Sequence, residues 1–128
     1  MSFCHPFDDA EIIAGQGTLG LEIVEDLPGV TQIVVPLGGG GLISGIAIAA
    51  KSINPSIRVV GVQISSCAPY IHGLMPEGPV PTLADGIAVK KPGTITEPLV
   101  RKWVDEIVEV TEDDVADAMM LLLERSKL

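Results

Sequence analysis

Cysteines, aromatic side chains and basic residues are all scarce in this chain of 128 residues. Two cysteines, Cys4 and Cys67, are too few for a disulfide scaffold or a four-ligand zinc site, and they indicate a reducing, cytoplasmic setting. Only eight basic residues stand against 17 acidic ones, and the resulting net charge of −9 argues against nucleic acid as a partner. No apolar run approaches the roughly 18 residues of a membrane span, and no secretory signal follows Met1. We therefore expect no nucleic-acid partner and no membrane partner.

Hydrophobic residues make up 47% of the chain, which is enough for a buried core in a single unit spanning residues 1–128. The first predicted helix runs from Ala10 to Asp26 behind the acidic cap Asp8-Asp9. Three glycines lie inside this helix, and each costs about 1 kcal/mol relative to alanine. We expect another segment to pack closely against the backbone at these glycines, which are Gly15, Gly17 and Gly20.

A βαβ unit follows, because two short β-branched segments flank an alanine-rich stretch of helical length. Both segments are apolar on both faces, which predicts an α/β fold in three layers, with a mostly parallel sheet and helices on both faces. Residues 65–91 hold four prolines and no clear period, so we expect mostly loop there. The predicted strands are 31–36, 57–63 and 106–110, and the other predicted helices are 42–53, 94–104 and 111–126.

The tetraglycine Gly38–Gly41 is the most informative feature of the sequence, since it links a predicted strand to a predicted helix. Open α/β sheets bind ligands at this position. Glycines let the backbone approach an anion closely, and the start of the helix adds partial positive charge. A tight turn without a ligand would need only two glycines, so the run favours a phosphate site.

The surrounding residues narrow the kind of phosphate ligand. The dinucleotide pattern fails, because Ile43 stands at its last glycine position and Gln63 replaces the acid at the end of the second strand. No glycine-lysine pair follows, so the run is not a nucleotide-binding P-loop. A ligand with a single phosphate is the remaining expectation.

Other polar residues carry weaker signals. His5 and His72 lack metal-ligand spacing, and Asp113 and Asp114 are explained by a helix cap. Asp85 lies in the predicted loop, where a turn carboxylate is the simpler interpretation and a functional role stays open.

Four segments together closely resemble one family: His5-Pro6-Phe7-Asp8-Asp9, Ile13-Ala14-Gly15-Gln16-Gly17-Thr18, Pro36 with Gly38-Gly39-Gly40-Gly41-Leu42, and Leu83-Ala84-Asp85-Gly86. The family is that of the threonine dehydratases and serine racemases, which are fold-type II enzymes with pyridoxal 5'-phosphate as cofactor. The resemblance extends from about Phe3 to the last residue, and the unbroken tetraglycine favours the dehydratase branch. It implies that the chain is part of the large, cofactor-binding domain of such an enzyme.

The resemblance also implies roles for particular residues. Gly38, Gly39, Gly40, Gly41 and Leu42 would bind the cofactor phosphate through backbone amides. In the serine racemase branch a glutamate and an aspartate help to bind a divalent metal. This chain has Gln63 and Pro69 at those positions, so we expect no metal site.

Three family residues have no counterpart in this chain: the lysine that holds the cofactor covalently, an asparagine at the cofactor ring and a serine at the pyridine nitrogen. The resemblance therefore implies an internal fragment of a homo-oligomeric L-threonine or L-serine dehydratase, inactive by itself and with no catalytic residue of its own. The parent reaction would eliminate water from a small amino acid and release ammonia and a 2-oxo acid. Two alternatives stay open: a non-catalytic phosphate-binding or interaction module, and a member of the serine racemase branch.

Overall fold

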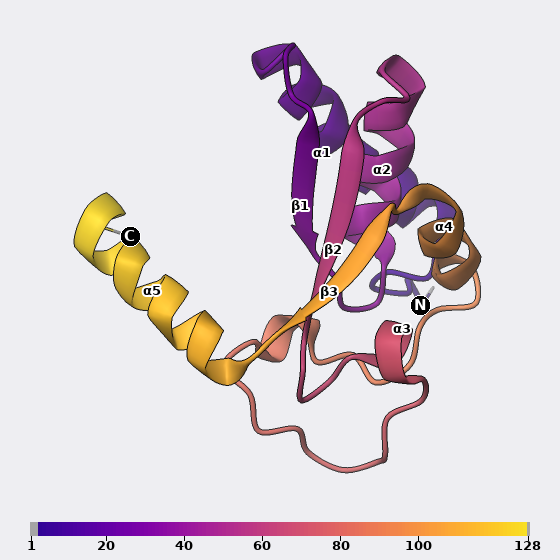
Figure 1. The fold of residues 1–128 in the computed structure, drawn as a ribbon. Coiled ribbons are helices and arrows are strands. Elements are labelled where there is room, and N and C mark those ends of the chain that lie inside the picture. The colour runs from indigo at the N-terminus through magenta and orange to yellow at the C-terminus, as the bar shows by residue number, and fades with distance from the viewer. Residues whose placement is uncertain (1–2, 128) are drawn as a thin grey trace.

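Three parallel strands form the central sheet in the computed structural model, which describes residues 3–127 (Figure 1). The strands are β1 (Gln32–Pro36), β2 (Arg58–Ile64) and β3 (Glu106–Val110), and β2 lies between the other two. Val35 of β1 pairs with Gly61 of β2, which in turn pairs with Ile107 of β3. All three predicted strands are therefore present, and their ends are within one residue of the prediction.

Two helical connections join these strands. α2 (Gly41–Ile53) connects β1 to β2, and α4 (Thr96–Trp103) precedes β3. Both connections step across the sheet in the same direction, so right-handed crossovers place α2 and α4 on the same face. α1 (Ala10–Asp26) packs against α2 on that side, and Figure 1 shows both helices behind the sheet. The predicted α/β class, with a parallel sheet flanked by helices, is confirmed. The sequence predicts helices on both faces, whereas α1, α2 and α4 share one face and Val34 on the other face of β1 is exposed.

The hydrophobic core lies between the sheet and α2 because one face of each carries large aliphatic side chains. Ile33 and Val35 alternate with exposed residues along β1, and Val59 of β2 is fully buried beside them. The side chains that meet them from the helices are Ile43, Ile46, Ala47 and Ala50 of α2 and Val100 of α4. This packing fixes the start of α2 at the carboxyl end of β1.

The contact between α1 and α2 depends on glycine, as the sequence predicts for two of the three positions. A Cβ atom added at Gly17 would lie 3.2 Å from the Gly45 carbonyl oxygen, and one at Gly20 would lie 2.8 Å from the Ile46 carbonyl oxygen. The prediction is wrong for Gly15, where a Cβ atom would meet nothing within 4 Å. Gly15 is exposed on the other side of the helix, so no neighbouring backbone requires it.

Residues 65–91 form mostly loop, as expected, but they contain two short elements that the sequence pattern does not reveal. α3 (Pro69–His72) begins at a proline in the first helical position, and a 3-10 turn (η1) spans Asp85–Ile87. Elements of three or four residues are too short to show a hydrophobic period.

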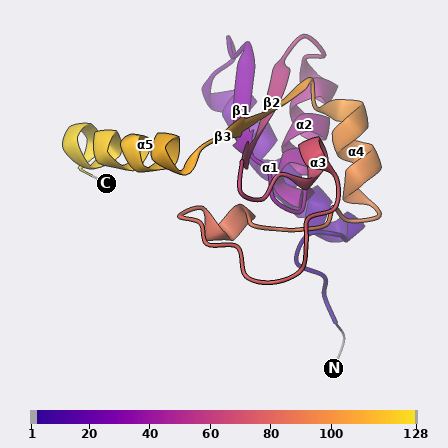
Figure 2. The same ribbon diagram turned by 60° about the horizontal axis from the view of Figure 1, so that its bottom comes forward.

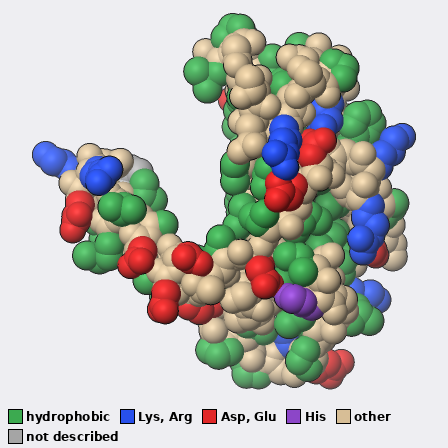
Figure 3. All heavy atoms as spheres, in the orientation of Figure 1, with side chains coloured by type: hydrophobic (Ala, Val, Ile, Leu, Met, Phe, Trp, Pro, Cys, Tyr) green, Lys and Arg blue, Asp and Glu red, His purple; other side chains and the backbone are tan. Residues whose placement is uncertain are grey.

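The last helix, α5 (Glu112–Ser126), extends away from the rest of the molecule (Figures 1 and 2). Thr111 and Asp114 form a capping box at its start, as the sequence predicts. None of its described residues is buried, and the face of β1 that carries Val34 is also open, with Val34 58% exposed. Hydrophobic side chains are visible in the hollow between α5 and the body (Figure 3). The exposed apolar residues of α5 are Met119, Met120, Leu121, Leu122 and Leu123.

Candidate functional site

The tetraglycine loop joins the carboxyl end of β1 to the first turn of α2, as predicted. Gly40 is the N-cap of α2 and has φ +97°, a left-handed conformation that side chains with a Cβ atom rarely adopt. The ring of Phe7 lies directly against Gly39, where a Cβ atom would overlap it. Because Gly40 needs its unusual φ and Gly39 needs the space, the loop can take this path only with glycine at both positions.

Three carbonyl groups of this segment, those of Leu37, Gly39 and Gly40, accept hydrogen bonds from other protein groups. The Gly39 carbonyl accepts hydrogen bonds from the hydroxyl groups of Thr96 (2.6 Å) and Tyr70 (3.2 Å). The Leu37 carbonyl accepts one from the side-chain amide of Gln63 (3.2 Å), and the Gly40 carbonyl accepts one from the Ser44 N–H (3.1 Å).

The N–H groups of the same segment, in contrast, have no hydrogen-bond partner in the described part of the protein. Within residues 3–127, no hydrogen bond to another protein group involves an N–H group of Gly38–Gly41 or of Leu42. These donors lie at the N-terminus of a 13-residue helix, whose dipole adds partial positive charge. A segment with several unpaired N–H groups at the N-terminus of a helix is able to bind an anion.

A cavity of about 410 Å³ lies beside these free donors. It is bordered by the loop itself, by Phe7, by Gln16 of α1 and by Gly86 and Ile87 from the η1 region. The four sequence segments that carry the family resemblance therefore border a single cavity, although they are far apart in the chain. Among the described residues, no charged side chain lines it, so an anion there would be held by main-chain dipoles alone.

Asp8 ties the N-terminal segment to the start of α4. Its carboxylate accepts hydrogen bonds from the N–H groups of Thr94 (2.8 Å), Ile95 (2.7 Å) and Thr96 (3.1 Å), and from the Thr94 hydroxyl (2.9 Å). Partial burial opposes ionisation, but these donors outweigh it and hold the pKa of Asp8 below its ordinary value. Asp8 thus fixes the helix that carries Thr96, and Thr96 in turn holds the glycine loop.

The other candidate residues lie outside this cavity. His5 accepts the N–H groups of Phe7 and Asp8 in a local turn, and His72 pairs with Glu109 on the surface. Asp85 is exposed in η1, where its backbone carbonyl accepts the Ala88 N–H. The described residues include no group of three or more histidines, cysteines and acids that could hold a metal ion.

Three residues that hold or border the loop are not predictable from the sequence pattern: Phe7, Tyr70 and Thr96. Tyr70 and Thr96 lie 31 and 57 residues beyond Gly39, in segments without a recognisable motif for this role. Phe7 is marked in the sequence only by the segment His5–Asp9 of the family resemblance. Nothing in the local pattern signals that their side chains meet at the loop.

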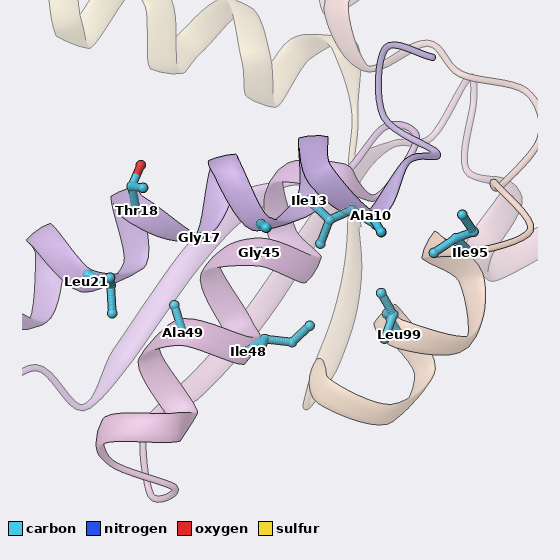
Figure 4. A pocket seen from close by; sticks show the side chains of 11 residues that line it. Ala10, Ile13, Gly17, Thr18, Leu21, Gly45, Ile48, Ala49, Ile95 and Leu99 are labelled. Carbon is cyan, nitrogen blue, oxygen red and sulfur yellow. The ribbon is translucent and has the colours of Figure 1, made fainter. Parts of the chain in front are cut away.

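A second cavity, of about 380 Å³, lies between α1, α2 and α4 and differs in character (Figure 4). Ile13, Ile48 and Leu99 border it together with small residues such as Ala49. Its lining is almost entirely carbon, and the Thr18 hydroxyl at its edge already donates to the Gly15 carbonyl. This cavity offers no polar groups that would bind a phosphate.

The fold is that of an α/β protein, and its glycine loop presents N–H groups, unpaired within the described residues, at the carboxyl end of a parallel sheet, where proteins of this class bind ligands. A family model described as "Pyridoxal-phosphate dependent enzyme" matches residues 1–128. The chain belongs to this family of pyridoxal-phosphate-dependent enzymes.

No helix within residues 3–127 is long and apolar enough to cross a membrane.

Curated relatives of this chain are named as threonine ammonia-lyases or threonine dehydratases. The chain is 56% identical to an L-threonine ammonia-lyase of Thermotoga maritima over 98% of its own length and 33% of that protein. It is 50% identical to the catabolic L-threonine dehydratase TdcB of Escherichia coli, over 98% of its length and 40% of that protein. The chain thus spans between a third and two fifths of the length of these relatives.

Solved structures of a threonine deaminase and a serine racemase are also similar to this chain. A threonine deaminase from T.th. superposes with a TM-score of 0.89 at 38% identity, over 96% of this chain and 45% of that one. Maize serine racemase superposes with a TM-score of 0.88 at 37% identity, over 97% of this chain and 40% of that one. Both branches that the sequence left open are therefore represented among the similar structures.

Proposed function

We propose that this chain supplies the phosphate-binding loop of a pyridoxal-phosphate-dependent ammonia-lyase that acts on L-threonine or L-serine. The observation that carries the proposal is the set of N–H groups of Gly38–Gly41 and Leu42 at the start of α2, none of which has a protein partner within residues 3–127. The substrate class is supported by the threonine ammonia-lyase and dehydratase names of the relatives. When bound, the cofactor supplies an electron sink for the carbanion that elimination requires.

The residues of the chain would bind and orient the cofactor by its phosphate. The N–H groups of Gly38, Gly39, Gly40, Gly41 and Leu42 would donate to the phosphate oxygens, and the α2 dipole would stabilise their negative charge. The site holds no charged side chain among the described residues, so each main-chain donor carries a large share of the binding. Phe7 and Ile87 border the cavity and would keep water from these hydrogen bonds.

A titration of the chain with inorganic phosphate and with pyridoxal 5'-phosphate, followed by amide NMR, tests the proposal. We expect the resonances of residues 38–42 to shift selectively with both ligands. Gly40→Val should abolish the response, because its Cβ would lie 2.5 Å from the Tyr70 hydroxyl oxygen and because valine resists a positive φ.

Gly15→Ala is the matched control, since a Cβ atom there meets nothing within 4 Å and the loop should respond as before. If both ligands shift resonances elsewhere and leave residues 38–42 unchanged, the assignment of the loop is wrong.

Serine racemization is the second candidate, because serine racemase structures are among the close structural neighbours. The environment of Gln63 favours the dehydratase. Its side chain is buried and binds the Leu37 carbonyl and the Tyr70 N–H, so it is engaged with the protein backbone. A divalent metal that raised the thermal stability of the chain would instead support the racemase branch.

We also propose a cytoplasmic, self-associating protein. Both cysteines are free thiols, and Cys4 is exposed, which suits a reducing compartment.

The apolar side chains of α5 and Val34 on the open face of β1 expose surface that a soluble protein normally covers. A second copy of the chain would cover it, by pairing of strand edges or by exchange of α5.

A further inference from the structure

Tyr70 contacts the glycine loop from a part of the chain in which the sequence pattern predicts no functional residue. It is 6% exposed and lies in α3, and its hydroxyl donates a hydrogen bond of 3.2 Å to the Gly39 carbonyl. Burial raises the pKa of the Tyr70 phenol, so the hydroxyl keeps its proton and remains a donor. Tyr70 is thus a neutral, buried donor directed at the main chain of the loop.

The direction of the Gly39 carbonyl decides the direction of the next N–H group. The described chain contains no cis peptide bond, and in a trans peptide the carbonyl and the following N–H point in opposite directions. When Tyr70 and Thr96 draw the Gly39 carbonyl inward, the Gly40 N–H must point outward. The glycines on both sides of this peptide have few steric restraints of their own, so the hydrogen bonds set its orientation.

Gln63 orients a second peptide of the loop, the one between Leu37 and Gly38, and it also binds Tyr70. Its Nε2 donates to the Leu37 carbonyl, which turns the Gly38 N–H outward by the same geometry. Its Oε1 accepts the Tyr70 N–H at 3.1 Å. One buried side-chain amide therefore links the peptide that precedes Gly38 to the residue that holds Gly39.

We propose that Tyr70 is a positioning residue that presents the Gly40 N–H to the phosphate, with Thr96 and Gln63 as its supports. The inference rests on the proposed phosphate-binding role of the loop. Loss of one hydrogen bond to a glycine peptide lets that peptide rotate, and its N–H then has to be realigned when the anion binds. For Tyr70→Phe we expect the dissociation constant for phosphate to rise about 3- to 10-fold.

The test compares amide NMR spectra of the full 128-residue chain, its Tyr70→Phe variant and a His72→Gln control, with inorganic phosphate as the probe. His72 lies in the same helix but faces solvent and pairs with Glu109, so its replacement should leave the loop unchanged. Before phosphate is added, Tyr70→Phe should shift the Gly39 carbonyl and Gly40 amide resonances and little else. On titration it should weaken the Gly40 response most, while the Leu42 amide still shifts.

Failure of the positioning role and failure of the proposed function give different results in this experiment. If the Gly39 and Gly40 resonances and the phosphate affinity are the same in Tyr70→Phe and the parent chain, the positioning role is wrong even though the loop binds phosphate. If the parent chain does not respond to phosphate at residues 38–42, the proposed function itself is wrong. Should Tyr70→Phe not fold, Thr96→Val removes the other hydroxyl on the same carbonyl, and an unchanged Gly40 response in that variant overturns the inference.

Discussion

Replacement of Asp8 by asparagine should destabilise a contact between distant parts of the chain while changing almost no volume. Asp8 Oδ1 accepts the N–H groups of Ile95 and Thr96, and Oδ2 accepts the N–H and hydroxyl of Thr94. Asparagine keeps one acceptor oxygen but places an NH₂ group where two donors now point. The variant therefore loses two hydrogen bonds and the negative charge at the start of α4.

The expected cost follows from these contacts. A net hydrogen bond contributes about 1 kcal/mol, and loss of a capping carboxylate at a helix N-terminus costs a similar amount. Since asparagine retains part of the cap, we expect the free energy of unfolding to fall by about 1–2 kcal/mol. For a chain of this size that corresponds to a decrease in Tm of about 4–10 °C.

The pH dependence of the stability difference between the parent chain and Asp8→Asn provides a second, independent test. The pKa of Asp8 in the folded protein lies below its ordinary value of 3.8, so ionisation of Asp8 favours the folded state. This contribution is complete well above pH 3.8 and is lost as the pH falls through the lower folded-state pKa. Asp105, Glu112 and Asp114 shift in the same direction, so only the difference between parent and variant isolates Asp8.

Thermal unfolding followed by circular dichroism between pH 7 and pH 3 measures both effects. The Tm difference between the parent and Asp8→Asn should be largest near neutral pH and should shrink toward pH 3. Asp9→Asn is the matched control, because Asp9 caps only its own helix and asparagine is an equally good N-cap. An equal Tm loss in both variants, or a difference that does not change with pH, would refute the reasoning about Asp8.

Three further predictions concern packing, association and activity. Gly45→Ala should destabilise the fold by about 1–3 kcal/mol, because its Cβ would overlap the Ile13 carbonyl, whereas Gly15→Ala should stabilise α1 by up to about 1 kcal/mol; chemical denaturation of both variants checks this. Sedimentation at micromolar concentrations should show dimers or larger species, and Leu122→Glu in α5 should shift them toward monomer; a compact parent monomer with cooperative unfolding contradicts the prediction. The 128-residue chain with added cofactor should form no 2-oxobutanoate from L-threonine, since no family lysine motif is present, and steady product formation would disprove it.

The local features of this chain are predictable because neighbouring residues determine them. The acidic cap at Asp9 and the capping box at Thr111 follow from residues within one turn of each other, and the βαβ unit follows from three consecutive segments of the chain. The glycine loop also belongs to this class, because a strand, four glycines and a helix in direct succession leave few other backbone paths. The anion-binding interpretation therefore follows from the residues of this segment alone.

Contacts over long sequence distances were decided by the tertiary structure alone. Asp8 reaches Thr94, just before α4, across 86 residues, and Tyr70 and Thr96 reach the glycine loop from separate segments. Gly15 and Gly17 look equivalent in the sequence, yet only Gly17 faces the backbone of α2. A hydrogen bond between distant segments leaves no periodic signal, because its partners are brought together by the packing of the sheet and helices around them. The sequence thus determined the position and the path of the glycine loop, and the tertiary structure determined which side chains hold its backbone in place.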